Sequence, residues 1–255
     1  MTSIKSYNLK SLFGLIILLF CLLPLAQAQN HFEGSMTIKL SDGSNPSDNE
    51  EVTLFVRENR LRISGNAANA VNFAPISGES VLLRADQRDI LIFSDDNTAV
   101  QIKLQELETL LNMFSQGQNQ PSVPEVSDNI TIQKTGQTRR IQGYNAEQLI
   151  STNSDKPNEV VHIWVTDQIK IDWVKMFDAF GSLSKQVGLE DFKTRYAWDL
   201  TKTPLLIQTF RNNELRGSIE MVDITSRRLT QAEIDVPQGV QLMTFFQMMM
   251  RQSQR

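Results

Sequence analysis

Hydrophobic and polar residues alternate along most of the chain beyond residue 31, with the period of two that is typical of half-buried β-strands. The first such run places Phe32, Gly34, Met36, Ile38 and Leu40 on one side of a strand. Turn-forming dipeptides between later runs, such as Glu58-Asn59 and Asn212-Asn213, indicate hairpins. Because tight turns cannot join parallel strands, the pattern predicts an antiparallel sheet. Its further strands are predicted at residues 52–56, 61–63, 81–83, 90–93, 98–102, 130–134, 139–142, 146–151, 160–166, 205–210 and 215–224.

Two segments have the helical period instead, over about residues 104–114 and 172–186. Their apolar faces consist of Leu104, Leu107, Leu110, Leu111 and Phe114 in the first helix and Trp173, Phe177 and Phe180 in the second. Residues 41–49 and the Gln/Ser/Pro-rich residues 115–128 are predicted to be loops. Neither side of the long 115–128 loop is complete alone, so we expect one domain.

Together these elements predict a mainly β protein with covering helices. The fold class is a single curved antiparallel sheet that forms a half-open barrel. A sheet must cover its apolar face, and helices do so in this architecture. The two apolar helix faces either line a lipid cavity or simply cover the sheet, and an incomplete cover leaves a groove.

The first 28 residues have the pattern of a signal peptide. Lys5 and Lys10 precede an apolar run over residues 11–25, and Ala26-Gln27-Ala28 supplies the small-x-small pattern of a cleavage site. The apolar run is shorter than the roughly 20 residues that span a bilayer, which favours cleavage over a membrane anchor. We therefore predict an exported protein, periplasmic or extracellular. Its mature part, residues 29–255, is expected to be one antiparallel β domain without a transmembrane segment.

Charge and composition narrow the choice of partners. The chain has 29 acidic and 25 basic residues, and a formal net charge of −4 argues against a nucleic-acid binder. Its single cysteine, Cys21, lies in the predicted leader, which excludes a disulfide scaffold. Cleavage after Ala28 would expose Gln29-Asn30-His31, a spacing that can hold Cu(II) or Ni(II). Cyclisation of the terminal glutamine would remove the amine ligand, so we predict no metal site and no cofactor.

Short matches to serine-acylase motifs occur at Ser182-x-x-Lys185, Ser127-Asp128-Asn129 and Lys134-Thr135-Gly136. In those enzymes the S-x-x-K motif comes first, whereas here it comes last. No G-x-S-x-G sequence accompanies either histidine. The chain is therefore predicted not to be an enzyme, with a hydrolase as the least favoured alternative.

Four segments in sequence order carry a family resemblance. They are Phe32-Glu33-Gly34, Gly143-Tyr144, Trp164-Val165-Thr166 and Pro237-Gln238-Gly239-Val240. Over residues 32–243 the chain resembles an uncharacterised exported bacterial family, a domain of unknown function with F-E-G, G-Y-x-C-x-x-Y, V-W-V-T and P-x-G-Y segments. It departs from that pattern with Ala146 in place of cysteine and Val240 in place of tyrosine. The family is similar in style to the periplasmic lipoprotein carriers, whose curved sheet surrounds acyl chains. The resemblance implies their fold and compartment, and implies ligand binding only by analogy.

The predicted function is non-enzymatic binding of an apolar or amphipathic ligand, a lipid or lipoprotein, in a groove behind the sheet. The alternative is a structural or protein-interaction module of the cell envelope with no ligand. The Met- and Phe-rich tail, residues 242–255, is expected to dock on its own domain and close the groove, or to contact a membrane surface or a partner. The predicted ligand-binding residues are Leu107, Leu111, Phe114, Phe177, Phe180, Phe245, Phe246 and Met249.

Overall fold

The structure is a computed structural model that describes residues 31–43, 45–65, 78–94, 97–106, 129–179 and 201–252. The predicted signal peptide, the 115–128 loop and the later parts of both predicted helices lie outside these ranges. The described residues from His31 onward belong to one compact unit.

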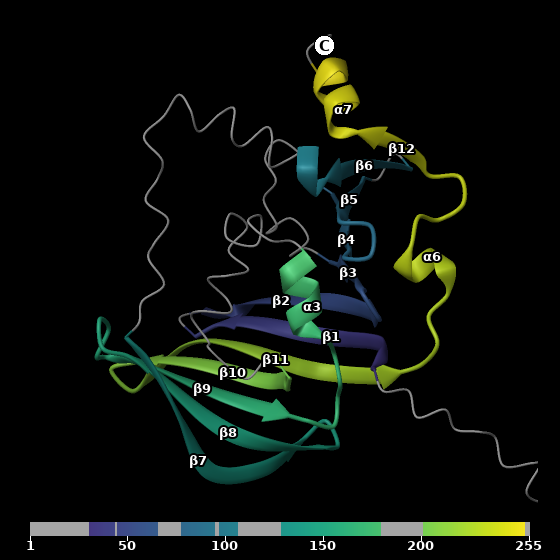
Figure 1. The fold of residues 1–255 in the computed structure, drawn as a ribbon. Helices are drawn as coiled ribbons and strands as arrows, with labels where there is room; N and C mark the ends of the chain where they lie inside the picture. The colour runs from purple at the N-terminus through teal and green to yellow at the C-terminus, as the bar shows by residue number, and fades with distance from the viewer. Residues whose placement is uncertain are drawn as a thin grey trace, which may run out of the picture. The chain divides into compact units, whose positions relative to one another are not determined.

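Twelve strands of the described residues form a single open, curved sheet (Figure 1). Its strand order is β12-β6-β5-β4-β3-β2-β1-β11-β10-β9-β8-β7. All neighbouring strands pair antiparallel except β12 and β6, which pair parallel. The predicted mainly β fold with one curved sheet is therefore confirmed, with one parallel pair at its edge. The strands are β1 (Glu33–Asp42), β2 (Asn45–Arg57), β3 (Arg60–Ser64), β4 (Ser80–Arg84), β5 (Asp89–Ser94), β6 (Thr98–Lys103), β7 (Ile130–Ile141), β8 (Tyr144–Asn153), β9 (Glu159–Thr166), β10 (Thr203–Arg211), β11 (Glu214–Ser226) and β12 (Gln241–Thr244).

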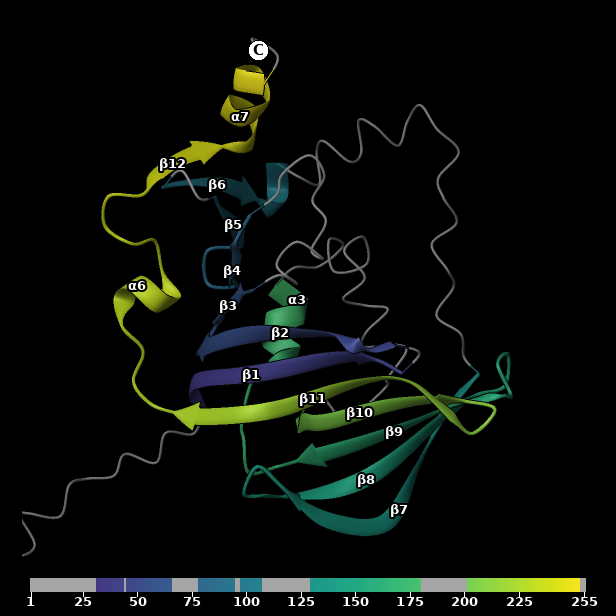
Figure 2. The same ribbon diagram turned by 180° about the vertical axis from the view of Figure 1, so that it is seen from behind.

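Three helices accompany the sheet in the described residues: α3 (Trp173–Ala179), α6 (Gln231–Ile234) and α7 (Phe245–Gln252). Figures 1 and 2 show α3 and α6 on opposite sides of the part of the sheet that contains β3 to β6. A helical turn also begins at Leu104, directly after β6, where the sequence predicts the first helix. No helix of the described residues has both the length and the apolar character needed to cross a membrane.

The main core lies on the face of the sheet that α3 covers. Met36, Leu54 and Ile92 are buried there from three strands, together with Trp173 and Met176 of α3. A second cluster on the α6 side joins Leu82, Leu91 and Phe93 to Leu229 and Ile234. Both faces of β4 and β5 are therefore buried, which explains why their sequences are continuously apolar instead of alternating.

Two tight hairpins depend on residues that accept a positive φ. Gln142 and Gly143 connect β7 to β8 with φ of 48° and 84°, and Asn212 and Asn213 connect β10 to β11 with φ of 52° and 63°. Positive φ at both central residues is the requirement of the type I′ turn, whose twist matches that of the flanking strands. The predicted hairpin about Asn212-Asn213 is thereby confirmed.

Three predicted boundaries are wrong. The predicted 41–49 loop is mostly strand, because β1 continues to Asp42 and β2 begins at Asn45. The strands predicted at 130–134 and 139–142 form one strand, β7, with a register shift between Lys134 and Thr138. The tail contains a strand as well as a helix, because residues 241–244 pair with β6. In each case backbone pairing with a neighbouring strand outweighs the local composition.

Candidate functional site

A pocket of about 440 Å³ opens where β1, β2, β10 and β11 lie side by side. Strand pairing explains its floor. Leu40 of β1 pairs with Ile219 of β11, and Ile219 pairs with Ile207 of β10, so the three apolar side chains form one row across the sheet. Paired residues of antiparallel strands point to the same face. This row therefore lies on the face of β1 that carries Met36.

Gly217 accounts for the depression beside this row. It lies on the same face, paired with Asp42 on one side and with Thr209 on the other. Having no side chain, it leaves the space above the strand unfilled. The closest atom to a Cβ placed at Gly217 would be the carbonyl oxygen of Ser41, at 3.4 Å, which is an ordinary contact. The pocket thus exists because a glycine stands where the sheet would accept a larger residue.

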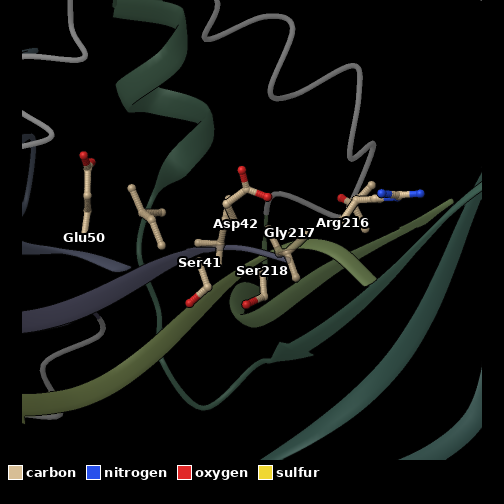
Figure 3. Close-up of a pocket in the computed structure, with 10 residues that line it drawn as sticks. Ser41, Asp42, Glu50, Arg216, Gly217 and Ser218 are labelled. Atoms are coloured by element: carbon tan, nitrogen blue, oxygen red, sulfur yellow. The ribbon is translucent and has the colours of Figure 1, made fainter. Parts of the chain in front are cut away.

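Polar groups surround the apolar row. Asp42 and Glu50 extend to one side of the sheet, whereas Ser41 and Ser218 point to the other (Figure 3). Arg216 lies at the rim, where it donates a hydrogen bond of 2.7 Å to Glu214. The pocket therefore combines an apolar floor with a polar, partly acidic rim, which is the composition expected of a site for an amphipathic molecule.

The apolar row continues beyond the pocket. Ile207 pairs with Ile163 of β9, which pairs with Leu149 of β8, so one stripe crosses five strands. Ile163, Ile207 and Leu149 are buried in a third cluster with Val161 and Val165. Only the Leu40 and Ile219 end of the stripe is partly open. The pocket is the place where this stripe meets solvent.

Of the eight predicted ligand-binding residues, the three whose side chains the structure describes, Phe245, Phe246 and Met249, do not line this pocket. Leu107, Leu111, Phe114 and Phe180 lie outside the described residues, and Phe177 belongs to α3. The remaining three lie on α7: Phe245 packs against the main core, whereas Phe246 and Met249 are exposed. Sequence reasoning missed the pocket-lining set, although a glycine within a strand pattern is a recognised sign of a close approach or a gap.

A second polar pocket, of about 490 Å³, lies around Arg57 and Arg60. Its arginines already hold the segment that includes α6. Arg57 donates to the Leu229 carbonyl at 3.4 Å, and Arg60 donates to Asp235 at 2.6 Å and to Asp86 at 2.7 Å. The contacts with Leu229 and Asp235 connect β2 and β3 to residues 172 and 175 positions away. We interpret this pocket as part of a structural clasp.

Two more arginines complete this clasp. Arg62 stacks on the Phe93 ring and donates to the Ala232 carbonyl at 2.9 Å. Arg84 donates to Asp235 at 3.1 Å. We use the name "arginine clasp" for Arg57, Arg60, Arg62 and Arg84 with their partners on residues 229–235. It fixes the path of the chain from β11 to β12 across the α6 side of the sheet.

The clasp shifts the pKa of its carboxyl groups. The hydrogen bond from Arg60 lowers the pKa of Asp86 below its ordinary value, against a smaller opposing effect of burial. Burial acts to raise the pKa of Asp235, but hydrogen bonds from Arg60 and the Val236 amide outweigh it, and the net pKa is lowered. Both groups are therefore ionised at neutral pH and neutralise the neighbouring guanidinium groups.

The chemical motifs considered from the sequence do not assemble in the described residues. Ser182, Lys185, Ser127 and Asp128 lie outside them, and Thr135 of β7 bonds to the Gln148 side chain at 3.0 Å. Among the described His, Cys, Asp and Glu side chains, no three are placed to hold a metal ion. Gln29 and Asn30 of the predicted copper or nickel site are not described.

The fold and pocket define a class: an open, curved β-sheet with a pocket that has an apolar floor and a polar rim. A family model described as a domain of unknown function, DUF4412, matches residues 32–240. The chain belongs to this family. The match confirms the resemblance to a family of unknown function. It covers residues 32–240, whereas the resemblance was expected over residues 32–243. None of the curated proteins compared with the chain matches it.

Several solved structures are similar at low identity. An uncharacterised conserved protein from Thermus thermophilus has a TM-score of 0.38 and 8% identity, covering 83% of this chain and 91% of that one. MucB has a TM-score of 0.39 and 11% identity, and the match covers 85% of this chain and 62% of MucB. A LolA superfamily protein from Nitrosomonas europaea has a TM-score of 0.26 and 11% identity, covering 81% and 90%.

Proposed function

We propose that the protein is an exported, non-enzymatic component of the cell envelope that binds an apolar or amphipathic ligand in the pocket at Gly217. The ligand class is a lipid or the acyl part of a lipoprotein, and the compartment is the periplasm or the cell exterior. The observation that carries the proposal is the apolar row of Leu40, Ile207 and Ile219 beside an unfilled glycine position.

The arrangement suits an amphipathic ligand for two reasons. Removing apolar surface from water contributes about 25 cal/mol per Å², so contact of an acyl chain with the open parts of Leu40 and Ile219 contributes to affinity. The guanidinium group of Arg216 and the hydroxyl of Thr209 line the same pocket and can bind a polar or anionic group at the end of the acyl chain. The apolar helix residues Leu107, Leu111, Phe114, Phe177 and Phe180 stay the predicted cover of such a ligand.

The test is uptake of a fluorescent fatty-acid probe by the exported protein. Gly217→Leu places a side chain in the pocket and is expected to weaken probe binding at least about tenfold, equivalent to about 1.4 kcal/mol. Gly217→Ala is expected to weaken binding less, because its methyl group fills less of the space. Glu220→Leu is the matched control, since it places the same side chain in the same strand on the other face.

Native mass spectrometry of protein purified from its own envelope adds a second measurement, in which co-purifying lipid is the expected result. If the parent protein takes up no apolar probe and carries no lipid, the ligand-binding proposal is wrong. A structural or protein-interaction module of the envelope then takes its place. Equal binding by Gly217→Leu and the parent, with both folded, would show that the ligand binds elsewhere.

A further inference from the structure

Helix α7 has one apolar face that is buried against the core and a second apolar face that is exposed. Phe245 and Met248 face the core, where Met248 is 7% exposed. Phe246, Met249 and Met250 are 72%, 42% and 48% exposed. At about 100° per residue these three side chains fall within an arc of about 100°, away from the packed face. Together they form the exposed ridge of α7.

The ridge is held in a fixed orientation. β12 pairs with β6 and leads directly into α7, and Met243 packs against the main core. Thr244 begins the helix with a reciprocal cap: its hydroxyl accepts the Gln247 amide at 3.2 Å, and its own amide donates to the Gln247 side chain at 2.9 Å. Such a capping box fixes the first turn of a helix. The ridge is therefore a preformed surface at the edge of the sheet (Figure 1).

The segment that carries the ridge is basic. Residues 236–255 contain no aspartate or glutamate and two arginines, Arg251 and Arg255, in a chain whose formal net charge is −4. Arg251 is exposed on α7, and one of its guanidinium nitrogens lies 3.7 Å from the Met243 sulfur. An exposed ridge of Phe and Met, on a segment whose sequence contains two arginines and no acid, suits an anionic bilayer surface.

We propose that α7 is a membrane-docking element that inserts Phe246, Met249 and Met250 into the interface of an anionic phospholipid bilayer. Methionine is flexible and polarizable, so these side chains adapt to acyl chains of any arrangement. The contact is shallow and reversible, because one short helix supplies a small apolar area. This proposal is independent of ligand binding at Gly217, since β12 and β1 are separated by five other strands.

The experiment is flotation of the exported protein with vesicles of phosphatidylcholine alone or with phosphatidylglycerol. The parent is expected to float with the anionic vesicles, and more weakly with the neutral ones. A triple variant, Phe246→Ser, Met249→Ser and Met250→Ser, is expected to partition at least about tenfold more weakly, because an inserted Phe side chain alone accounts for such a factor. Arg251→Gln is expected to lose about fivefold on anionic vesicles only.

The matched control replaces two exposed apolar residues elsewhere, Val174→Ser and Leu215→Ser, which are 41% and 40% exposed. It should float as the parent does. Because Cys21 is the only cysteine and lies in the predicted leader, Phe246→Cys in the exported form offers one site for an environment-sensitive fluorophore. Its emission should shift to the blue on vesicles, whereas the emission of a label at Leu215→Cys, at the exposed control position, should shift less.

Two results would overturn the proposal. The first is a parent protein that binds neither type of vesicle. The second is a triple variant that is folded, as judged by its melting, and floats as well as the parent. Loss of flotation with intact uptake of the fatty-acid probe would support docking by α7 and leave the pocket at Gly217 unaffected.

Discussion

At the scale of single residues, the most deeply buried charges lie on β4 and β5. Arg84 donates two hydrogen bonds to Asp89, of 2.8 and 2.6 Å, in the fork geometry that suits a carboxylate. Gln101 donates a third bond to Asp89 at 2.6 Å. The side chains of Arg84 and Asp89 are only 6% and 2% exposed. Each charge is therefore tolerated only because its partner is present.

Asp89→Ala is expected to lower the free energy of unfolding by about 3–5 kcal/mol, because it leaves the Arg84 guanidinium buried without its main partner. Chemical denaturation measures the change. The control is Asp86→Ala, which removes a more exposed carboxylate and should cost at most about 1 kcal/mol. Equal effects of the two substitutions would contradict the assigned difference in burial.

Ile163 tests the apolar stripe. It is fully buried in the centre of β9, between Ile207 and Leu149. Ile163→Asp places a carboxylate in this cluster at a cost of several kcal/mol, out of a total stability of about 5–15 kcal/mol, and is expected to unfold the domain. Ile163→Val should cost only about 1 kcal/mol. A thermal melt of the Asp variant that matches the parent would disprove the burial of this face.

At the scale of elements, α6 is too short to be stable alone and depends on its contacts. Glu233 accepts hydrogen bonds from the Thr230 amide and hydroxyl, at 2.8 and 2.9 Å, and pairs with Arg227. The hydrogen bond from Arg227, followed by that from the Thr230 amide, lowers the pKa of Glu233 to about 2. Asp235 and Asp86, whose pKa values are also lowered, hold the same segment through Arg60.

The stability of the α6 segment is therefore expected to decrease at acidic pH. Below the ordinary carboxyl pKa the unfolded chain binds more protons than the folded one, so stability falls as pH decreases from about 5 towards 2. Above that range the full contribution is present. Glu233→Gln should flatten this dependence by at most about 1 kcal/mol, because the pair is partly exposed. Denaturation curves across this pH range measure it, and a variant with the same acid sensitivity as the parent would contradict the assignment.

At the scale of the whole molecule, the predicted export and cleavage determine which residues the mature protein contains. The exported protein is expected to begin at Gln29, or at its cyclised form, because Ala26-Gln27-Ala28 follows an apolar run that Pro24 ends. Intact-mass measurement and N-terminal sequencing of the exported protein test this. Retention of residues 1–28 would mean that the leader is an anchor, and membrane association would then need no contribution from α7.

Local pattern determined a large part of the fold. Alternation and short apolar runs identified eleven of the twelve described strands at least in part, because a strand with one buried face must repeat every two residues. The dipeptide Asn212-Asn213 located one turn, because asparagine accepts a positive φ, and Glu58-Asn59 located another, in which Glu58 has a φ of 51°. The fold class followed from these local features, because short turns leave neighbouring strands antiparallel.

Only the tertiary structure decided which residues far apart in the sequence lie side by side. Residues 241–244 form a strand because β6, far away in the sequence, supplies their backbone partners. The pocket unites Leu40, Ile207 and Gly217 through the register of three strands, and the arginine clasp unites β2 to β4 with residues 229–235. Sequence periodicity reports which face of its own element a residue occupies. Which distant residue stands beside it is set by strand order and register, and these depend on the folding of the whole sheet.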